Sequence, residues 1–237
     1  MRKISYVLGF ILLTVTLTAC GKNEFEDDGS TGRATNSEVS QQVEIKNLEL
    51  VEYGYERDLD GYLRVAAVIK NPNSEYTAKF AKIQWTFLDD KGVVISEPGS
   101  TVTIGAGETI VESFPAVRNE EFAEVNVELE VKDEDWIIEE VPKVKPSDIS
   151  LSELKVERGE ILGSYTIKGF IENTSDFDIS SVDVGVIFKK DGKIVGGTSK
   201  KTYKPMSAEL KYDFEIGTSI GFPEMDEYDV YIYNIEE

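Results

Sequence analysis

The chain has 237 residues, and its 45 acidic and 25 basic side chains give a formal net charge of −20. A surface this acidic repels nucleic-acid phosphates, so we expect no nucleic-acid partner. The sequence has no histidine and one cysteine. This excludes Ser-His-Asp triads, Cys-His pairs, His/Cys zinc sites and an intrachain disulfide.

The first segment is typical of a secretion signal. Arg2 and Lys3 precede an apolar stretch, residues 6–17, that ends shortly before Cys20. An alternative is that residues 4–19 remain as an uncleaved membrane helix. The apolar run is short for a membrane span, which favours a signal peptide over residues 1–19.

The end of this segment, Leu17-Thr18-Ala19-Cys20, resembles the lipobox of bacterial lipoproteins. The resemblance implies cleavage between Ala19 and Cys20 and a diacylglyceryl group on the Cys20 thiol. Two long acyl chains would hold the protein at the membrane almost permanently. The implied location is the outer face of the bacterial plasma membrane, outside the cytoplasm.

Residues 20–42 are predicted to form the acylated cysteine and a flexible acidic tether. The segment is rich in glycine, serine, threonine, asparagine and glutamate and has no aliphatic periodicity. A coil of this length has a root-mean-square reach of roughly 25 Å. It would lift the next domain clear of the lipid headgroups.

The rest of the chain contains an internal repeat with a period of about 100 residues. The matched segments follow one another in the same order in both copies. They are 43–50 with 149–156, 62–73 with 164–175, 83–95 with 184–195, 108–114 with 208–214, and 125–129 with 228–233.

Nearly every matched segment alternates apolar and polar residues and is rich in β-branched or aromatic side chains, which predicts strands. Turn sequences separate them: Asp90-Lys91-Gly92, Gly105-Ala106-Gly107 and Lys190-Asp191-Gly192. We predict an all-β chain with two tandem Ig-like antiparallel β-sandwich domains of about seven strands each. The predicted domains cover 43–132 and 148–237.

A linker over residues 133–147 is predicted between the two domains. Pro142 and Pro146 disfavour a continuous helix there, so we expect an extended segment. Of the linker residues, Trp136 is the strongest candidate for a residue packed between the domains. The alternative is that Trp136 is packed on an edge strand. Large aromatic residues on the predicted strands are expected in the cores: Trp85, Phe87, Phe170 and Phe188.

The arrangement resembles the FxLYD-type domain of lipoproteins and secreted proteins of Gram-positive bacteria. In the first copy the matching residues are Asn71 at a corner, then Trp85, Phe87 and Asp89 on a strand, and Gly92 in the turn. The second copy departs from the motif and offers Asn173, Phe188 and Gly192. The resemblance implies a β-sandwich fold and structural roles for these residues, with no catalytic residue and no cofactor.

Paired carboxylates are the acid/base chemistry that this composition permits. Among 45 acidic residues, however, some pairs will lie close together by chance, so a pair alone does not indicate catalysis. Asp58-Leu59-Asp60-Gly61 begins like a calcium loop, but Ile69 stands where the twelfth ligand should be. Loop acids such as Asp133-Glu134-Asp135, or Asp176 with Asp178, would bind calcium at most weakly. We therefore expect no metal site.

These observations predict a noncatalytic, lipid-anchored protein of the bacterial cell envelope that acts as a binding or spacer module. Its partners would be the membrane, through Cys20, and an unidentified envelope protein or polymer. Two alternative hypotheses are a carboxylate-dependent hydrolase of cell-wall glycan and a calcium-stiffened surface adhesion module.

Overall fold

The computed structural model describes residues 44–118, 121–139, 142–159, 163–202 and 205–237. The first repeat forms strands β1 (Glu49–Arg57), β2 (Tyr62–Lys70), β3 (Tyr76–Leu88), β4 (Val94–Ser96), β5 (Gly99–Ile104), β6 (Thr109–Arg118) and β7 (Glu124–Glu130). The connecting segment contains the 3-10 turns η1 (Asp133–Asp135) and η2 (Pro146–Asp148) and strand β8 (Trp136–Ile138). The second repeat forms β9 (Ile149–Arg158), β10 (Tyr165–Asn173), β11 (Ser181–Lys190), β12 (Lys193–Thr202), β13 (Lys211–Gly217) and β14 (Glu227–Glu236).

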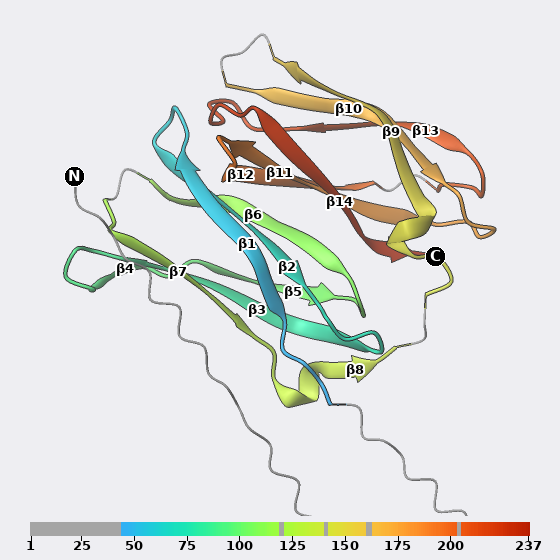
Figure 1. The fold of residues 1–237 in the computed structure, drawn as a ribbon, viewed down its shortest axis with the longest axis horizontal. Coiled ribbons are helices and arrows are strands. Elements are labelled where there is room, and N and C mark those ends of the chain that lie inside the picture. The colour runs from blue at the N-terminus through green and yellow to red at the C-terminus, as the bar shows by residue number, and fades with distance from the viewer. Residues whose placement is uncertain (1–43, 119–120, 140–141, 160–162, 203–204) are drawn as a thin grey trace, which may run out of the picture. The chain divides into compact units, whose positions relative to one another are not determined.

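The fold is all-β, as predicted, and the described strands form four antiparallel sheets. We number the sheets in the order in which they stack in Figure 1. Sheet 1 holds β3, β4, β5, β7 and β8, and sheet 2 holds β1, β2 and β6. Sheet 3 holds β11, β12 and β14, and sheet 4 holds β9, β10 and β13.

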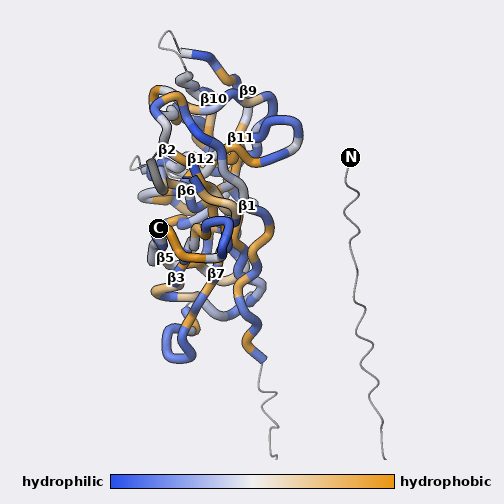
Figure 2. The backbone as a smooth tube through the Cα atoms, turned by 90° about the vertical axis from the view of Figure 1, so that its left-hand side faces the viewer, coloured by the Kyte–Doolittle hydropathy of each residue, from blue (hydrophilic) through white to orange (hydrophobic). Residues whose placement is uncertain are grey.

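Alternation along the strands places one set of side chains in a core, as in β3. From Ala81 to Phe87, every second residue of β3 is fully buried and the residues between them are more exposed. In Figure 2, hydrophobic stretches run within strands, while several loops are hydrophilic. The pattern that predicted the strands therefore also identifies which face of β3 is covered.

The first core lies between sheets 1 and 2. Trp85 is fully buried at its centre, where Tyr53 and Phe114 approach its ring edge-on at centroid distances of 6.0 and 6.1 Å. Edge-to-face contacts of this kind add to the free energy gained by burial. The prediction that Trp85 and Phe87 are core residues is confirmed.

The second core lies between sheets 3 and 4 and includes the fully buried Phe188. Phe222 packs edge-on against Phe188 with ring centroids 5.0 Å apart. The prediction for Phe170 was wrong, because Phe170 pairs with Ser152 and Asp213 on the outer face of sheet 4. The neighbouring positions Ile167 and Ile171 face the core.

Sheets 2 and 3 also pack against each other, so residues of the second repeat enter the first core. Ile187, Ile194 and Tyr233 are buried members of the cluster that holds Trp85. Glycines allow this close approach: a Cβ on Gly54 would lie 2.4 Å from the carbonyl oxygen of Ile194. Residues 43–237 thus form one compact unit.

The repeats stack head to tail. β1, β2 and β6 of sheet 2 occupy the places that β9, β10 and β13 take in sheet 4. Sheet 3 in turn corresponds to sheet 1, because β12, β11 and β14 are ordered like β4, β3 and β7. The contact between the repeats therefore joins two different kinds of sheet, sheet 2 of the first repeat and sheet 3 of the second.

The connecting segment is partly ordered as structure of the first repeat. β8 pairs with the start of β3, where Ala78 lies opposite Trp136 and Tyr76 opposite Ile138. Trp136 is partly buried against the first core, whereas Ile138 is 70% exposed. Trp136 is thus an edge-strand residue, one of the two interpretations that the sequence allowed.

Candidate functional site

The predicted corner residue Asn71 is fully buried at the end of β2. Its side-chain amide donates to the carbonyls of Tyr76, Ile104 and Gly105 at 2.7, 3.1 and 3.0 Å. Its side-chain oxygen accepts the backbone N–H of Asn73 at 3.0 Å. One asparagine thereby satisfies backbone groups at two connections, β2–β3 and β5–β6, that would otherwise be buried without partners.

Asn173 occupies the equivalent place at the end of β10 and is also fully buried. Its amide donates to the carbonyls of Phe177 and Met206 at 2.7 and 3.1 Å. Its oxygen accepts the backbone N–H of Ser175 at 3.1 Å. The two corners share one hydrogen-bond plan, so these residues hold loops in place.

Among the other motif residues, Asp89, Gly92 and Gly192 shape turns. Asp89 accepts the backbone N–H groups of Lys91 and Val93, each at 2.8 Å, and Gly92 has a φ of 78°. In the second repeat Asp191 and Gly192 both have positive φ, as a two-residue hairpin turn with the twist of its strands requires. These positions therefore set the geometry of hairpins.

Ala19 and Cys20, the predicted cleavage and lipidation residues, lie outside the described residues. No helix in the described ranges is long and apolar enough to cross a membrane. Likewise, no group of three or more histidine, cysteine or acidic side chains in those ranges is arranged to hold a metal ion. Asp58, from the calcium-like sequence, pairs with Arg64 at 2.5 Å.

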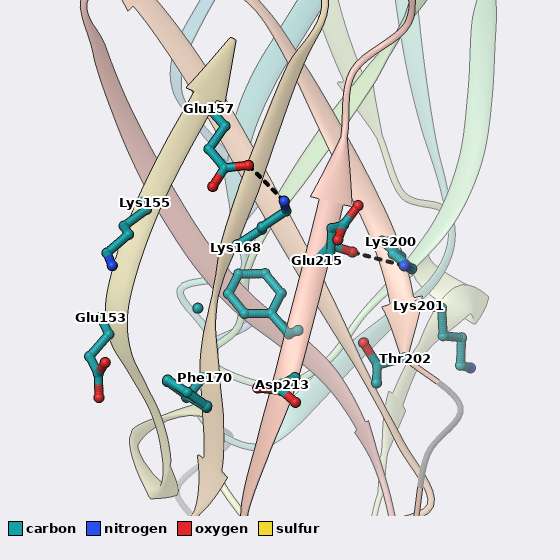
Figure 3. Close-up of a pocket in the computed structure, with 12 residues that line it drawn as sticks. Glu153, Lys155, Glu157, Lys168, Phe170, Lys200, Lys201, Thr202, Asp213 and Glu215 are labelled. Atoms are coloured by element: carbon teal, nitrogen blue, oxygen red, sulfur yellow. Dashed lines mark hydrogen bonds and ion pairs between the residues drawn. The ribbon is translucent and has the colours of Figure 1, made fainter. Parts of the chain in front are cut away.

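A hollow of about 810 Å³ lies mainly on the outer face of sheet 4 and is shown in Figure 3. Gly169 is one of the lining residues, and close packing leaves no room for a side chain there: a Cβ would come within 2.9 Å of the Ser152 carbonyl oxygen and 3.2 Å of the Phe214 ring. The rim consists of charged side chains from four strands: Glu153, Lys155, Glu157, Lys168, Lys200, Lys201, Asp213 and Glu215.

Most lysines of this hollow already have partners. Lys168 pairs with Glu157 at 2.6 Å, and Lys200 donates to the carbonyl of Glu215 at 2.8 Å. Lys211, just beside the hollow, lies 4.2 Å from the centre of the Phe170 ring and also pairs with Glu153. The aromatic ring of this face is therefore covered by a cation, which leaves a charged, solvated surface.

A smaller hollow of about 490 Å³ lies on the outer face of sheet 1. It contains Phe80, whose side chain is 66% exposed, beside the charged residues Lys82 and Glu130. Phe80 sits at a bulge in β3, where the register with β5 shifts between Ala78 and Ala81. No pattern in the sequence pointed to Phe80 as a functional residue.

The two repeats are also joined by hydrogen bonds beside a cavity of about 430 Å³. The carboxylate of Glu108 accepts the backbone N–H of Gly105 at 2.9 Å and that of Asn234 at 3.0 Å. The side-chain amide of Asn234 donates to Asp183 at 2.9 Å. Burial raises the pKa of both Glu108 and Asp183.

The two carboxylate oxygens of Glu108 accept one backbone N–H group from its own repeat and one from the second repeat, so this side chain links the repeats. Two further bonds cross the same interface. The Tyr233 hydroxyl donates to the Val111 carbonyl at 3.2 Å, and Lys189 pairs with Glu52 at 3.0 Å. The polar groups of the interface therefore fix how sheets 2 and 3 dock.

Glu112 on β6 is a partly buried acid whose removal we expect to stabilise the protein. Partial burial raises the pKa of Glu112 above its usual range. The folded state therefore holds a proton to higher pH than the unfolded chain does, and this group's contribution to stability falls as pH rises between the two pKa values. Glu112→Gln is expected to raise the free energy of unfolding at pH 7 by roughly 1 kcal/mol.

Urea denaturation at pH 4.5 and pH 7 measures this effect. The variant should lose less stability than the wild type between the two pH values. Glu128→Gln, which changes an exposed acid on β7, is the matched control. An unchanged pH slope in Glu112→Gln would contradict the prediction.

Comparison with known proteins assigns no family. No family model matches the sequence, and no curated protein matches it. Among solved structures 53 chains match, including the crystal structure of red sea bream transglutaminase, at 11% identity and a TM-score of 0.28. That match covers 80% of this chain and 29% of the transglutaminase chain. The resemblance to FxLYD-type domains stays a prediction.

Proposed function

We propose that this chain is a lipid-anchored, noncatalytic protein of the bacterial cell envelope, held outside the plasma membrane by an acylated Cys20. The observation that carries the proposal is the sequence Leu17-Thr18-Ala19-Cys20 at the end of an apolar segment with a basic start. The acyl chains would bind the membrane, and the acidic tether would separate it from the β-sheets.

The described residues support a role as a spacer that presents binding surfaces. The repeats share buried contacts, since Ile187 and Ile194 of the second repeat lie in the first core. Glu108 and Lys189 add polar bonds across the same interface. Packing this close limits motion between the repeats, so the outer faces of sheets 1 and 4 would be held at a fixed separation.

The anchor is tested by labelling bacteria that express the full chain with an alkyne analogue of palmitate. The wild type is expected to carry the label, to lack residues 1–19, and to fractionate with membranes. Cys20→Ala should lose the label and the cleavage. Label retained in Cys20→Ala, or recovery of the wild type in the cytoplasm, would overturn the proposal.

The binding role is tested by crosslinking on intact cells followed by mass spectrometry. We expect a reproducible set of envelope components that disappears in Cys20→Ala, because the anchor sets the protein's position. A hydrolytic activity on wall glycan that is lost when one pair of acids is changed would replace the noncatalytic assignment. That result would favour the hydrolase alternative.

A further inference from the structure

Phe80 is held in an unfavourable backbone conformation within a strand. Its φ is 53°, a value that bulky side chains rarely adopt, and it occupies a bulge between two pairs of β3 with β5. The other described non-glycine residues with positive φ, Glu153, Asp191, Glu209 and Asn234, all have polar side chains. Phe80 is the hydrophobic exception among them.

Packing does not explain this conformation, because Phe80 is 66% exposed. In the described part of the chain its ring makes no aromatic or cation–π contact, unlike the Phe170 ring that Lys211 covers. The positive φ of Phe80, an exposed aromatic residue at a bulge, therefore needs an explanation other than packing. Bulges of this kind occur next to binding sites, where they redirect a side chain.

The surroundings of Phe80 are polar. The other side chains of the 490 Å³ hollow include Lys82, Gln84, Glu130, Lys132 and Asp135. The four charged groups form no ion pair with any described residue. Two ammonium groups and two carboxylates therefore face the hollow as available donors and acceptors, and their charges cancel.

We propose that this hollow binds an uncharged glycan, with one sugar ring stacked on Phe80 and its hydroxyl groups bonded to the charged side chains around it. A pyranose ring has one apolar C–H face and a rim of hydroxyls, which matches a single aromatic ring within a polar hollow. The apolar core of a protein interface would instead call for further apolar side chains here. The proposal deepens the binding role proposed above and rests on it.

Charge favours an uncharged glycan over an acidic polymer. The whole chain has a formal charge of −20, which repels polyanions at long range. The balanced charges of the hollow neither attract nor repel a neutral ligand, while each hydroxyl can meet both a donor and an acceptor. The hollow would therefore recognise the sugar ring of the glycan and the arrangement of its hydroxyl groups.

The test measures binding of the full chain in detergent micelles to cellohexaose, chitohexaose, maltohexaose and mannohexaose by titration calorimetry. The wild type is expected to bind at least one of these probes. Phe80→Ala should weaken that binding at least tenfold. Phe177→Ala, which removes another exposed aromatic ring in the second repeat, should leave it unchanged.

Phe80→Gly separates binding from folding. Glycine adopts a φ of 53° without the penalty of a side chain, so its melting temperature is expected to equal or exceed that of the wild type. Its glycan binding should nevertheless be lost. A variant that melts normally and no longer binds shows that the ring contacts the ligand.

No binding of the wild type to any of the four probes at millimolar concentration would overturn the proposal. Equal binding by Phe80→Ala would also overturn it, as would a cellular crosslink at Phe80 to a protein with no glycan binding. The Cys20 labelling result is independent of these outcomes. A labelled Cys20 without glycan binding refutes the glycan site alone, and glycan binding without the label refutes the anchor alone.

Discussion

Asn71→Asp is expected to lower the free energy of unfolding by about 4 kcal/mol. The Asn71 amide donates to three carbonyl oxygens, and aspartate would place a carboxylate oxygen there without a hydrogen. Three carbonyls would lose their donor, and a charge would be buried beside them with no cation. The side chains have nearly the same shape, so the change tests the hydrogen bonds and not the packing.

Guanidinium denaturation followed by tryptophan fluorescence measures this loss. Asn126→Asp makes the same chemical change at an exposed site on β7 and is expected to stay within about 0.5 kcal/mol of the wild type. Asn173→Asp should also lower stability, since the Asn173 amide donates to two buried carbonyls in the same way. A loss below 1 kcal/mol in Asn71→Asp would show that the corner relaxes around the new group.

Gly54→Val is expected to lower the free energy of unfolding by about 3 kcal/mol. The added Cβ would overlap the backbone of Ile194, with the carbonyl oxygen 2.4 Å away and the Ile194 Cβ 2.6 Å away. Backbone atoms of a strand cannot rotate aside as a flexible side chain can. Sheets 2 and 3 must therefore move apart, and buried surface is lost along their contact.

Calorimetry of the full chain tests whether this damage is shared by both repeats. Because Ile187, Ile194 and Tyr233 lie in the first core, the wild type should unfold in one transition, which Gly54→Val moves as a whole. Glu56→Val, at an exposed site on the same strand, should have little effect. Two separate transitions in the wild type, of which Gly54→Val shifts one, would contradict a shared core.

Local patterns in the sequence carry the strand assignments. Alternation over 83–88 indicates β3, the matching segment 184–188 of the second copy indicates β11, and the glycines at 92 and 192 mark the turns that follow. The repeat itself brings Asn71 and Asn173 to equivalent positions. Each of these features depends on neighbours in the chain, so the sequence predicts it without knowledge of the tertiary structure.

Contacts between the repeats were missed, although a signal exists. Residues 65–69 of β2 and 184–188 of β11 are uninterrupted runs of apolar or small residues, which indicate strands covered on both faces. The sequence comparison also matched 108–114 with 208–214, whereas the strand pairing relates Ser113 to Glu215. Bulges at Phe80 and Glu153 shift the strand register. Their positions depend on the partner strand, so the sequence of one strand does not reveal them.

Head-to-tail stacking has a consequence for assembly. A contact between two different faces does not close on itself, so each added copy could in principle accept another and grow a fibre. The outer positions that are Ala66, Val68, Val111 and Ser113 in sheet 2 are Lys168, Phe170, Asp213 and Glu215 in sheet 4. Charged groups at these positions would lose their water in a further contact, which ends growth after two repeats. Apolar residues in place of the three charged ones would let further copies add to the stack and form a polymer.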